Sequence, residues 1–124
     1  MTCAAHIYTK GIHRQGDNIL LMALLERDEL PISDIETYDI RVVIFSERAI
    51  FRQYIYKDQS WGSDAAIADI DENGHIALNL TSDVTKEMKG QYYAQFLLSN
   101  GSEAIQSPIV PIFEVTPSIV HAIK

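Results

Sequence analysis

The chain has 124 residues and a mass of 14.0 kDa, with 47% hydrophobic and 22% charged residues, which suits one domain and is short for two. Ten Lys and Arg against seventeen Asp and Glu give a formal net charge of -7, which argues against nucleic acid as a partner. The acids gather in residues 58–87, and such a run predicts a solvated surface.

The start of the chain has neither the basic region nor the apolar stretch of a signal peptide. The longest apolar run, residues 19–25, has seven residues, against the roughly 20 that a membrane helix needs. We therefore expect neither export nor a membrane span. Cys3 is the single cysteine, so no internal disulfide is expected.

Residues 1–16 are predicted to form an N-terminal arm. They carry the apolar side chains of Ile7, Tyr8 and Ile12 among basic residues, and such an extended segment can dock on a neighbouring subunit by adding to a sheet edge. Ordinary disorder, or packing on the parent domain, is the alternative.

Three strands are predicted next. Residues 19–26 are apolar on both faces, which indicates a central strand or one covered by another surface. Residues 38–45 and 49–57 are rich in β-branched and aromatic residues, and both are typical of strands. The side chains expected on one face of residues 38–45 are Ile40, Val42 and Ile44.

A hairpin and a short helix follow. Asn73-Gly74 favours a two-residue type I′ turn that joins residues 66–71 to residues 75–80. Residues 82–89 are predicted to form a helical crossing, because Ser82 suits an N-cap and Gly90 suits a helix stop. The crossing leads into Gly90-Gln91-Tyr92, which resembles the step before the penultimate strand of immunoglobulin-like sandwiches, where an aromatic stands at the corner.

Residues 91–98 and 109–115 complete the strands, and the whole predicts an all-β, immunoglobulin-like antiparallel β-sandwich of seven or eight strands over residues 17–116. An up-and-down barrel is the alternative. Residues 117–124 are predicted as an apolar C-terminal tail. Its candidate partner-binding residues, added to those of the N-terminal arm, are Ile119, Val120 and Ile123.

The sequence predicts no catalytic, cofactor or metal site. The four histidines, His6, His13, His75 and His121, lack metal-ligand spacing. Residues 69–74 match the start of a calcium loop, but Leu80 stands where the bidentate Glu is needed. No nucleophile motif or phosphate-binding loop is present. We therefore expect a protein that is not an enzyme.

Three aromatic residues allow a different hypothesis. Trp61 is flanked by small residues in a loop and either stacks on a sugar or closes one end of the sandwich. With Tyr54 and Tyr56 it would form the stacking surface of a carbohydrate-binding module.

The order of motifs along the chain resembles a known group of proteins. The motifs are GDN at residues 16–18, DIRVVI at 39–44, DENG at 71–74 and LTSDVTKEMKGQYYA at 80–94. Together they resemble the N-terminal domain of tailed-phage baseplate upper proteins and small immunoglobulin-like virion proteins of phages that infect gut bacteria. The given sequence lacks the linker and receptor-adaptor region that follow in baseplate proteins, so the expectation extends to fibre-attachment and capsid-associated roles.

The resemblance implies a non-catalytic structural protein of the virion, made in the cytoplasm of the bacterial host. Its expected partners are other virion proteins and copies of itself, bound through arms and sheet edges. The carbohydrate-binding module, with a host-surface glycan as ligand, is the alternative.

Overall fold

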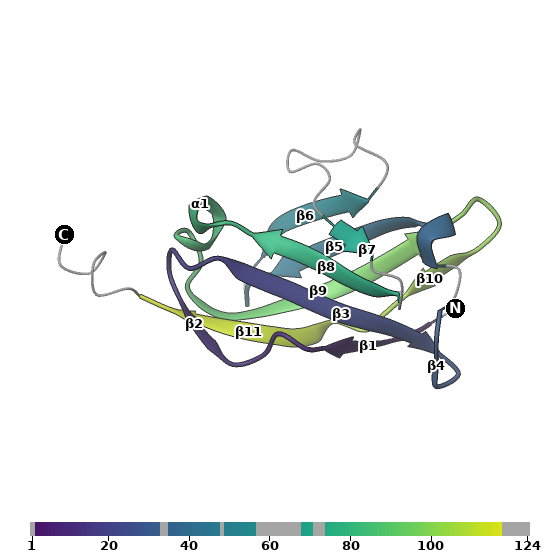
Figure 1. The fold of residues 1–124 in the computed structure, drawn as a ribbon, viewed down its shortest axis with the longest axis horizontal. Coiled ribbons are helices and arrows are strands. Elements are labelled where there is room, and N and C mark those ends of the chain that lie inside the picture. Colours follow the sequence, from purple (N-terminus) through teal and green to yellow (C-terminus); the bar gives the residue numbers. More distant parts are fainter. Residues whose placement is uncertain (1, 33–34, 48, 57–67, 71–73, 118–124) are drawn as a thin grey trace.

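The computed structural model describes residues 2–32, 35–47, 49–56, 68–70 and 74–117, except for the side chains of residues 36, 55, 56, 68 and 69. They form two β-sheets with one short helix at one end (Figure 1). The first sheet has the order β1 (Ala4–Ile7), β3 (Ile19–Arg27), β8 (His75–Leu80) and β7 (Ala68–Ile70), and β4 (Leu30–Pro31) pairs with β3. The second has the order β2 (Ile12–Arg14), β11 (Val110–Thr116), β9 (Gly90–Ser99), β5 (Asp39–Phe45) and β6 (Ile50–Tyr56), and β10 (Ala104–Gln106) pairs with β9. A 3-10 turn, η1 (Ile35–Thr37), precedes β5.

The strand order is that of the immunoglobulin fold, in which strands A-B-E-D face strands G-F-C. Here β1-β3-β8-β7 face β11-β9-β5, and β6 adds a C′ strand. The predicted sandwich is confirmed, and the barrel alternative is wrong because both sheets are open. The described parts of the chain contain eleven strands rather than seven or eight. The excess arises from short strands that have no alternating run of their own.

The core lies between the sheets and is filled by alternate side chains, as the sequence predicts. The inward faces of β5, β8 and β9 are all at most 3% exposed. Each large side chain buried in this way contributes about 1.5–3 kcal/mol to stability. The inward-facing residues of these three strands are Ile40, Val42, Ile44, Ile76, Leu78, Leu80, Tyr92, Ala94, Phe96 and Leu98.

β3 is the central strand of the first sheet, between β1 and β8. Its inward residues are at most 1% exposed, whereas Leu20 on the outward face is 48% exposed. Both pairing edges of β3 are therefore satisfied by neighbouring strands, but its outward face remains partly open.

The N-terminal segment is not an arm. β1 pairs antiparallel with β3 in the first sheet, whereas β2 pairs parallel with β11 in the second (Figure 1). Gly11, with a φ of 102°, lies between the two strands, and only glycine adopts such a backbone conformation readily. The predicted arm therefore forms part of both sheets.

The hairpin between β7 and β8 has a different register from the predicted one. A two-residue loop at 73–74 would pair Ile70 with Ala77, but Ile70 pairs with Ile76. Gly74 has a φ of 83°, so this glycine serves the left-handed conformation expected of a turn residue. Residues 71–73 lie outside the described residues.

The predicted helix is shorter than residues 82–89. α1 comprises Ser82–Thr85, its N-cap is Thr81, and the Thr81 side chain makes no capping hydrogen bond. The prediction of Ser82 as cap is wrong. Instead, the Ser82 N–H donates to Oδ1 of Asn18, 2.9 Å away in the turn before β3. Thr85 Oγ1 donates to the carbonyl of Asp17 at 2.6 Å, so α1 is tied to the β2–β3 connection.

The corner at the start of β9 has an aromatic residue, as predicted. Tyr92 is buried, and the backbone N–H of Lys89 donates to its hydroxyl at 2.8 Å. This contact corresponds to the tyrosine corner of immunoglobulin domains, where the second cysteine stands two residues later. Ala94 occupies that position here and is fully buried.

Replacing Asn18 by Ala should lower the free energy of unfolding by about 1 kcal/mol, because a helix-terminal N–H loses its acceptor. Thr81→Ala is the matched control and should change it by less than about 0.5 kcal/mol. Urea denaturation followed by circular dichroism measures both. Equal effects of the two substitutions would contradict the assignment of Asn18 as the cap.

Replacing Tyr92 by Phe should cost about 1–2 kcal/mol, because the Lys89 N–H is left without its partner. Tyr93→Phe is the control, since Tyr93 points to the outer face of the sheet, and should be nearly neutral. The same denaturation experiment tests this pair, and a neutral Tyr92→Phe would show that the corner hydrogen bond does not stabilise the fold.

Candidate interaction surfaces

Titratable residues do not gather into a reactive site in the described part of the chain. No group of three or more His, Cys, Asp and Glu residues there is placed to hold a metal ion. His6 contacts Glu26 at 2.5 Å, while the rings of His13 and His75 pack edge-on against Phe113 and Tyr8. His121 and residues 71–73 of the calcium-loop match lie outside the described residues.

The outer face of the second sheet carries an apolar surface that extends over several strands. We call it the β5–β9 face and define it by Val43, Phe45, Ile50, Tyr93 and Ile109. Residues of β5 alternate between core and outer face, so Val43 and Phe45 point outward. Val43 is nevertheless only 5% exposed, which shows that its neighbours cover it.

The register aligns this apolar surface across four strands. Ile50 of β6 pairs with Phe45 of β5, which pairs with Tyr93 of β9, which pairs with Pro111 of β11. Cross-strand neighbours of this kind are about 4.5–5.5 Å apart. The row is therefore continuous over the sheet.

A shallow hollow of about 590 Å³ lies in the β5–β9 face. Ile50 and Ile109 stand at its rim and are 54% and 55% exposed. Phe45, Tyr93 and Ala49 also line it. The combination of a hollow and protruding apolar side chains is the shape that a protein partner can fill.

The β5–β9 face was not predicted from the sequence. Its signal was the run Val42-Val43-Ile44-Phe45, in which apolar residues occupy the outward as well as the inward positions. Such a strand is typically covered on both faces; here the inner face packs in the core, whereas Phe45 on the outer face stays partly exposed.

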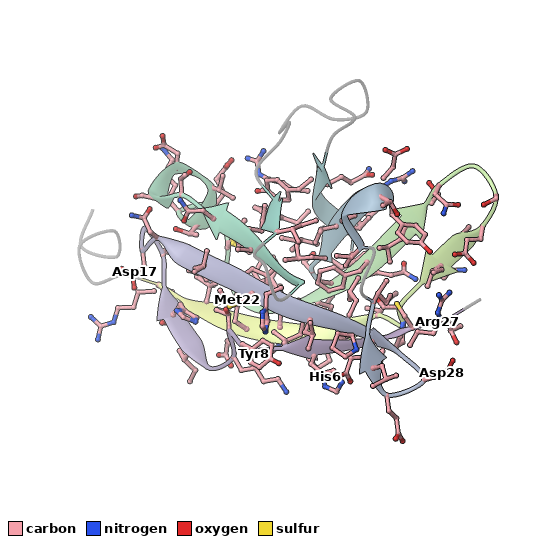
Figure 2. The ribbon with its side chains drawn as sticks, turned by 45° about the vertical axis from the view of Figure 1, so that its right-hand side comes forward. His6, Tyr8, Asp17, Met22, Arg27 and Asp28 are labelled. Carbon is pink, nitrogen blue, oxygen red and sulfur yellow. The ribbon has the colours of Figure 1, made fainter. Side chains whose placement is uncertain are left out.

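The first sheet has a second apolar stripe on its outer side, formed by Tyr8, Leu20 and Met22. Figure 2 shows Tyr8 beside Met22. The Tyr8 N–H donates to the carbonyl of Met22 at 2.9 Å. The Tyr8 ring lies edge-on to the His75 ring, with 5.4 Å between the centroids, and remains 57% exposed.

The partner-binding residues predicted within residues 1–16 separate into two groups. Tyr8 and Ile12 are 57% and 69% exposed and remain available to a partner, whereas Ile7 is 9% exposed and belongs to the core. The prediction for Ile7 is therefore wrong, because β1 turns this side chain inward. Ile119, Val120 and Ile123 lie outside the described residues.

Of the three predicted sugar-stacking residues, the structure describes the side chain of Tyr54. Tyr54 is 1% exposed and lies in the core, so its ring cannot stack on a sugar. Trp61 and the side chain of Tyr56 lie outside the described residues. The prediction for Tyr54 is wrong because Tyr54 pairs with Val42 of β5, whose side chain points into the core.

Cys3 is not in a free tail. Its side chain is 6% exposed, and its N–H donates to the carbonyl of Gln106 at 3.1 Å. Burial raises the pKa of the Cys3 thiol, and the positive charge of Arg27 lowers it by a smaller amount. The thiol therefore stays protonated at neutral pH and behaves as a small core residue.

No family model matches the chain, and no curated protein is detectably similar to it in sequence. Within the described residues, no helix has the length and apolar character needed to cross a membrane.

Cys3 should react with a thiol reagent more than about tenfold more slowly in the folded protein than in urea at pH 8, because reaction requires both exposure and the thiolate. Because the folded state favours the protonated thiol of Cys3, the free energy of unfolding should also fall as pH rises above the pKa that this thiol has in the unfolded chain. Absorbance of the released thiolate from Ellman's reagent measures the rates, and equal rates would contradict burial of Cys3.

Proposed function

We propose that this chain is a non-catalytic structural protein of a phage virion, made in the host cytoplasm, that joins virion components through the surfaces of its sandwich. The observation that carries the proposal is the β5–β9 face, an apolar row on the outside of a sheet. The resemblance of motif order to baseplate and small virion proteins adds the context of a phage particle.

The physical argument is the cost of leaving this face in water. Ile50 and Ile109 are both about half exposed, so covering them fully would contribute roughly 1 kcal/mol each to association. Phe45 and Tyr93 beside them offer aromatic surface, which often dominates the energy of protein interfaces. Net charge of -7 keeps the rest of the surface hydrated and limits nonspecific association.

The surfaces used for assembly differ from the expected arms. Residues 2–16 are held in the two sheets, so the outer faces and open strand edges remain as binding surfaces. Attachment through Ile119, Val120 and Ile123 stays a prediction. Of the residues of the carbohydrate-binding alternative, Tyr54 is buried in the core, and Trp61 and the side chain of Tyr56 lie outside the described residues.

Ile50→Lys and Ile109→Lys should each lower incorporation of the chain into particles at least about tenfold, because a charge would have to be buried in the contact. Leu30→Lys is the matched control, since Leu30 is 68% exposed on β4, away from this face. Incorporation is measured by quantitative mass spectrometry of purified particles, relative to the other structural proteins. Absence of the unsubstituted chain from particles would contradict the virion role, and equal loss with Leu30→Lys would contradict the role of the β5–β9 face.

A further inference from the structure

The free edge of β1 presents unpaired backbone groups. The N–H of Tyr8 points to β3, where it donates to Met22, whereas the N–H of Cys3 points away from β3 to Gln106. Along a β-strand, the backbone N–H and C=O groups of successive residues point alternately to one neighbouring strand and to the other. The N–H and C=O groups of Ala5 and Ile7 therefore point away from β3, as the N–H of Cys3 does.

These groups face an open hollow. The first residues of the chain touch the second sheet at two places, the Thr2–Gln106 bridge and the β2–β11 ladder. Between these places β1 lies in the other sheet, and a hollow of about 470 Å³ remains beside it. Its lining residues are Ala5, His6, Ile7, Tyr8, Lys10, Glu26, Val110 and Pro111. No backbone acceptor for the Ala5 or Ile7 N–H occurs within the described ranges.

We propose that two copies of this chain pair through their β1 edges, antiparallel and about a two-fold axis at His6. In this register Ala5 of one copy pairs with Ile7 of the other, and the reverse pair follows by symmetry. Each pair exchanges two hydrogen bonds, so four new hydrogen bonds form and the two first sheets become one continuous sheet. This inference goes beyond the proposed function, because it assigns contact between copies to a surface separate from the β5–β9 face.

The hydrogen-bond pattern favours a second copy as the partner, because an antiparallel edge is complementary to itself. β1 also lacks the features that usually protect an edge, such as proline or lysine within the strand. The opposite wall of the hollow, in contrast, contains Pro111, which has no N–H to donate. β1 is therefore the wall to which a strand can add.

The charges along the edge also favour the antiparallel pair. Glu26 pairs with Ala4 at the start of β1, whereas Lys10 follows its end, and both line the hollow. Reversing one copy brings Lys10 of each chain toward Glu26 of the other, whereas a parallel pair would bring like charges together. The two His6 side chains meet at the axis, each beside the Glu26 carboxylate of its own copy at 2.5 Å.

Ala5→Pro tests the hydrogen bonds. The Ala5 N–H takes no part in the β1–β3 ladder, so proline should leave the fold intact at this edge position. It removes two of the four intermolecular hydrogen bonds, and the dimer dissociation constant should rise roughly 30-fold or more. Sedimentation equilibrium of the purified chain measures the constant, circular dichroism checks the fold, and Ala4→Ser is the control that should leave dimerisation unchanged.

The charge pair supplies a second test that does not change the backbone. Lys10→Glu and Glu26→Lys should each weaken the dimer, and the double substitution should restore it.

A chain without substitutions that stays monomeric up to ~1 mM would overturn the inference. So would a dimer that persists in folded Ala5→Pro but is lost in Ile50→Lys, since that result would place the contact on the β5–β9 face. Loss of incorporation with Ile50→Lys while the β1 dimer persists would support both proposals separately.

Discussion

The division of the N-terminal segment between two sheets is the constraint on which the rest of the structure depends. β1 completes the edge of one sheet and β2 completes the edge of the other. At the crossing, the Thr9 side chain replaces the backbone ladder: its hydroxyl donates to the Leu20 carbonyl and accepts from the Met22 N–H. Gly11 then accepts a hydrogen bond from the Glu114 N–H at 3.0 Å. The crossing therefore links both sheets at one side and leaves the hollow beside β1.

The sandwich is held by packing, without the covalent link typical of antibody domains. Ala94 replaces the second cysteine of that link, and the single Cys3 lies in the core at the edge of the sheet. Stability therefore depends on the buried aliphatic and aromatic side chains and on a few polar ties between loops. Ser107 is one such tie: this buried hydroxyl accepts from the Phe96 N–H at 3.0 Å and donates to the Pro108 carbonyl at 2.8 Å, at the break between β10 and β11.

Long alternating strands could be predicted from sequence, because burial of one face imposes a period of two. Residues 75–80 and 91–98 show this clearly. β1 could not be predicted in the same way, since Ala-Ala-His-Ile is too short and too weakly apolar to indicate a face. Phe51 and Tyr54 are three residues apart in β6, so a regular strand would point them to opposite faces. Both nevertheless pack on the core, because the register of β6 shifts near Phe51.

The candidate surfaces were harder to predict than the core. The exposed state of Tyr8 and Ile12 was anticipated, but their place in sheet edges was not, because pairing partners are distant in sequence. The β5–β9 face required knowledge of which strands adjoin, since Ile50, Phe45 and Tyr93 come together only through the register. In the described part of the chain, faces and edges are the surfaces that this fold offers a partner.

Deleting residues 2–16 tests most directly whether the N-terminal segment is a structural part of both sheets. Urea unfolding of the truncated chain, followed by tyrosine fluorescence and circular dichroism, is the measurement. Loss of the cooperative transition is the predicted result, because two edge strands and the side chains of Cys3 and Ile7 would be removed from the sandwich. A truncated chain that unfolds cooperatively at the same urea concentration as the full chain would contradict this account.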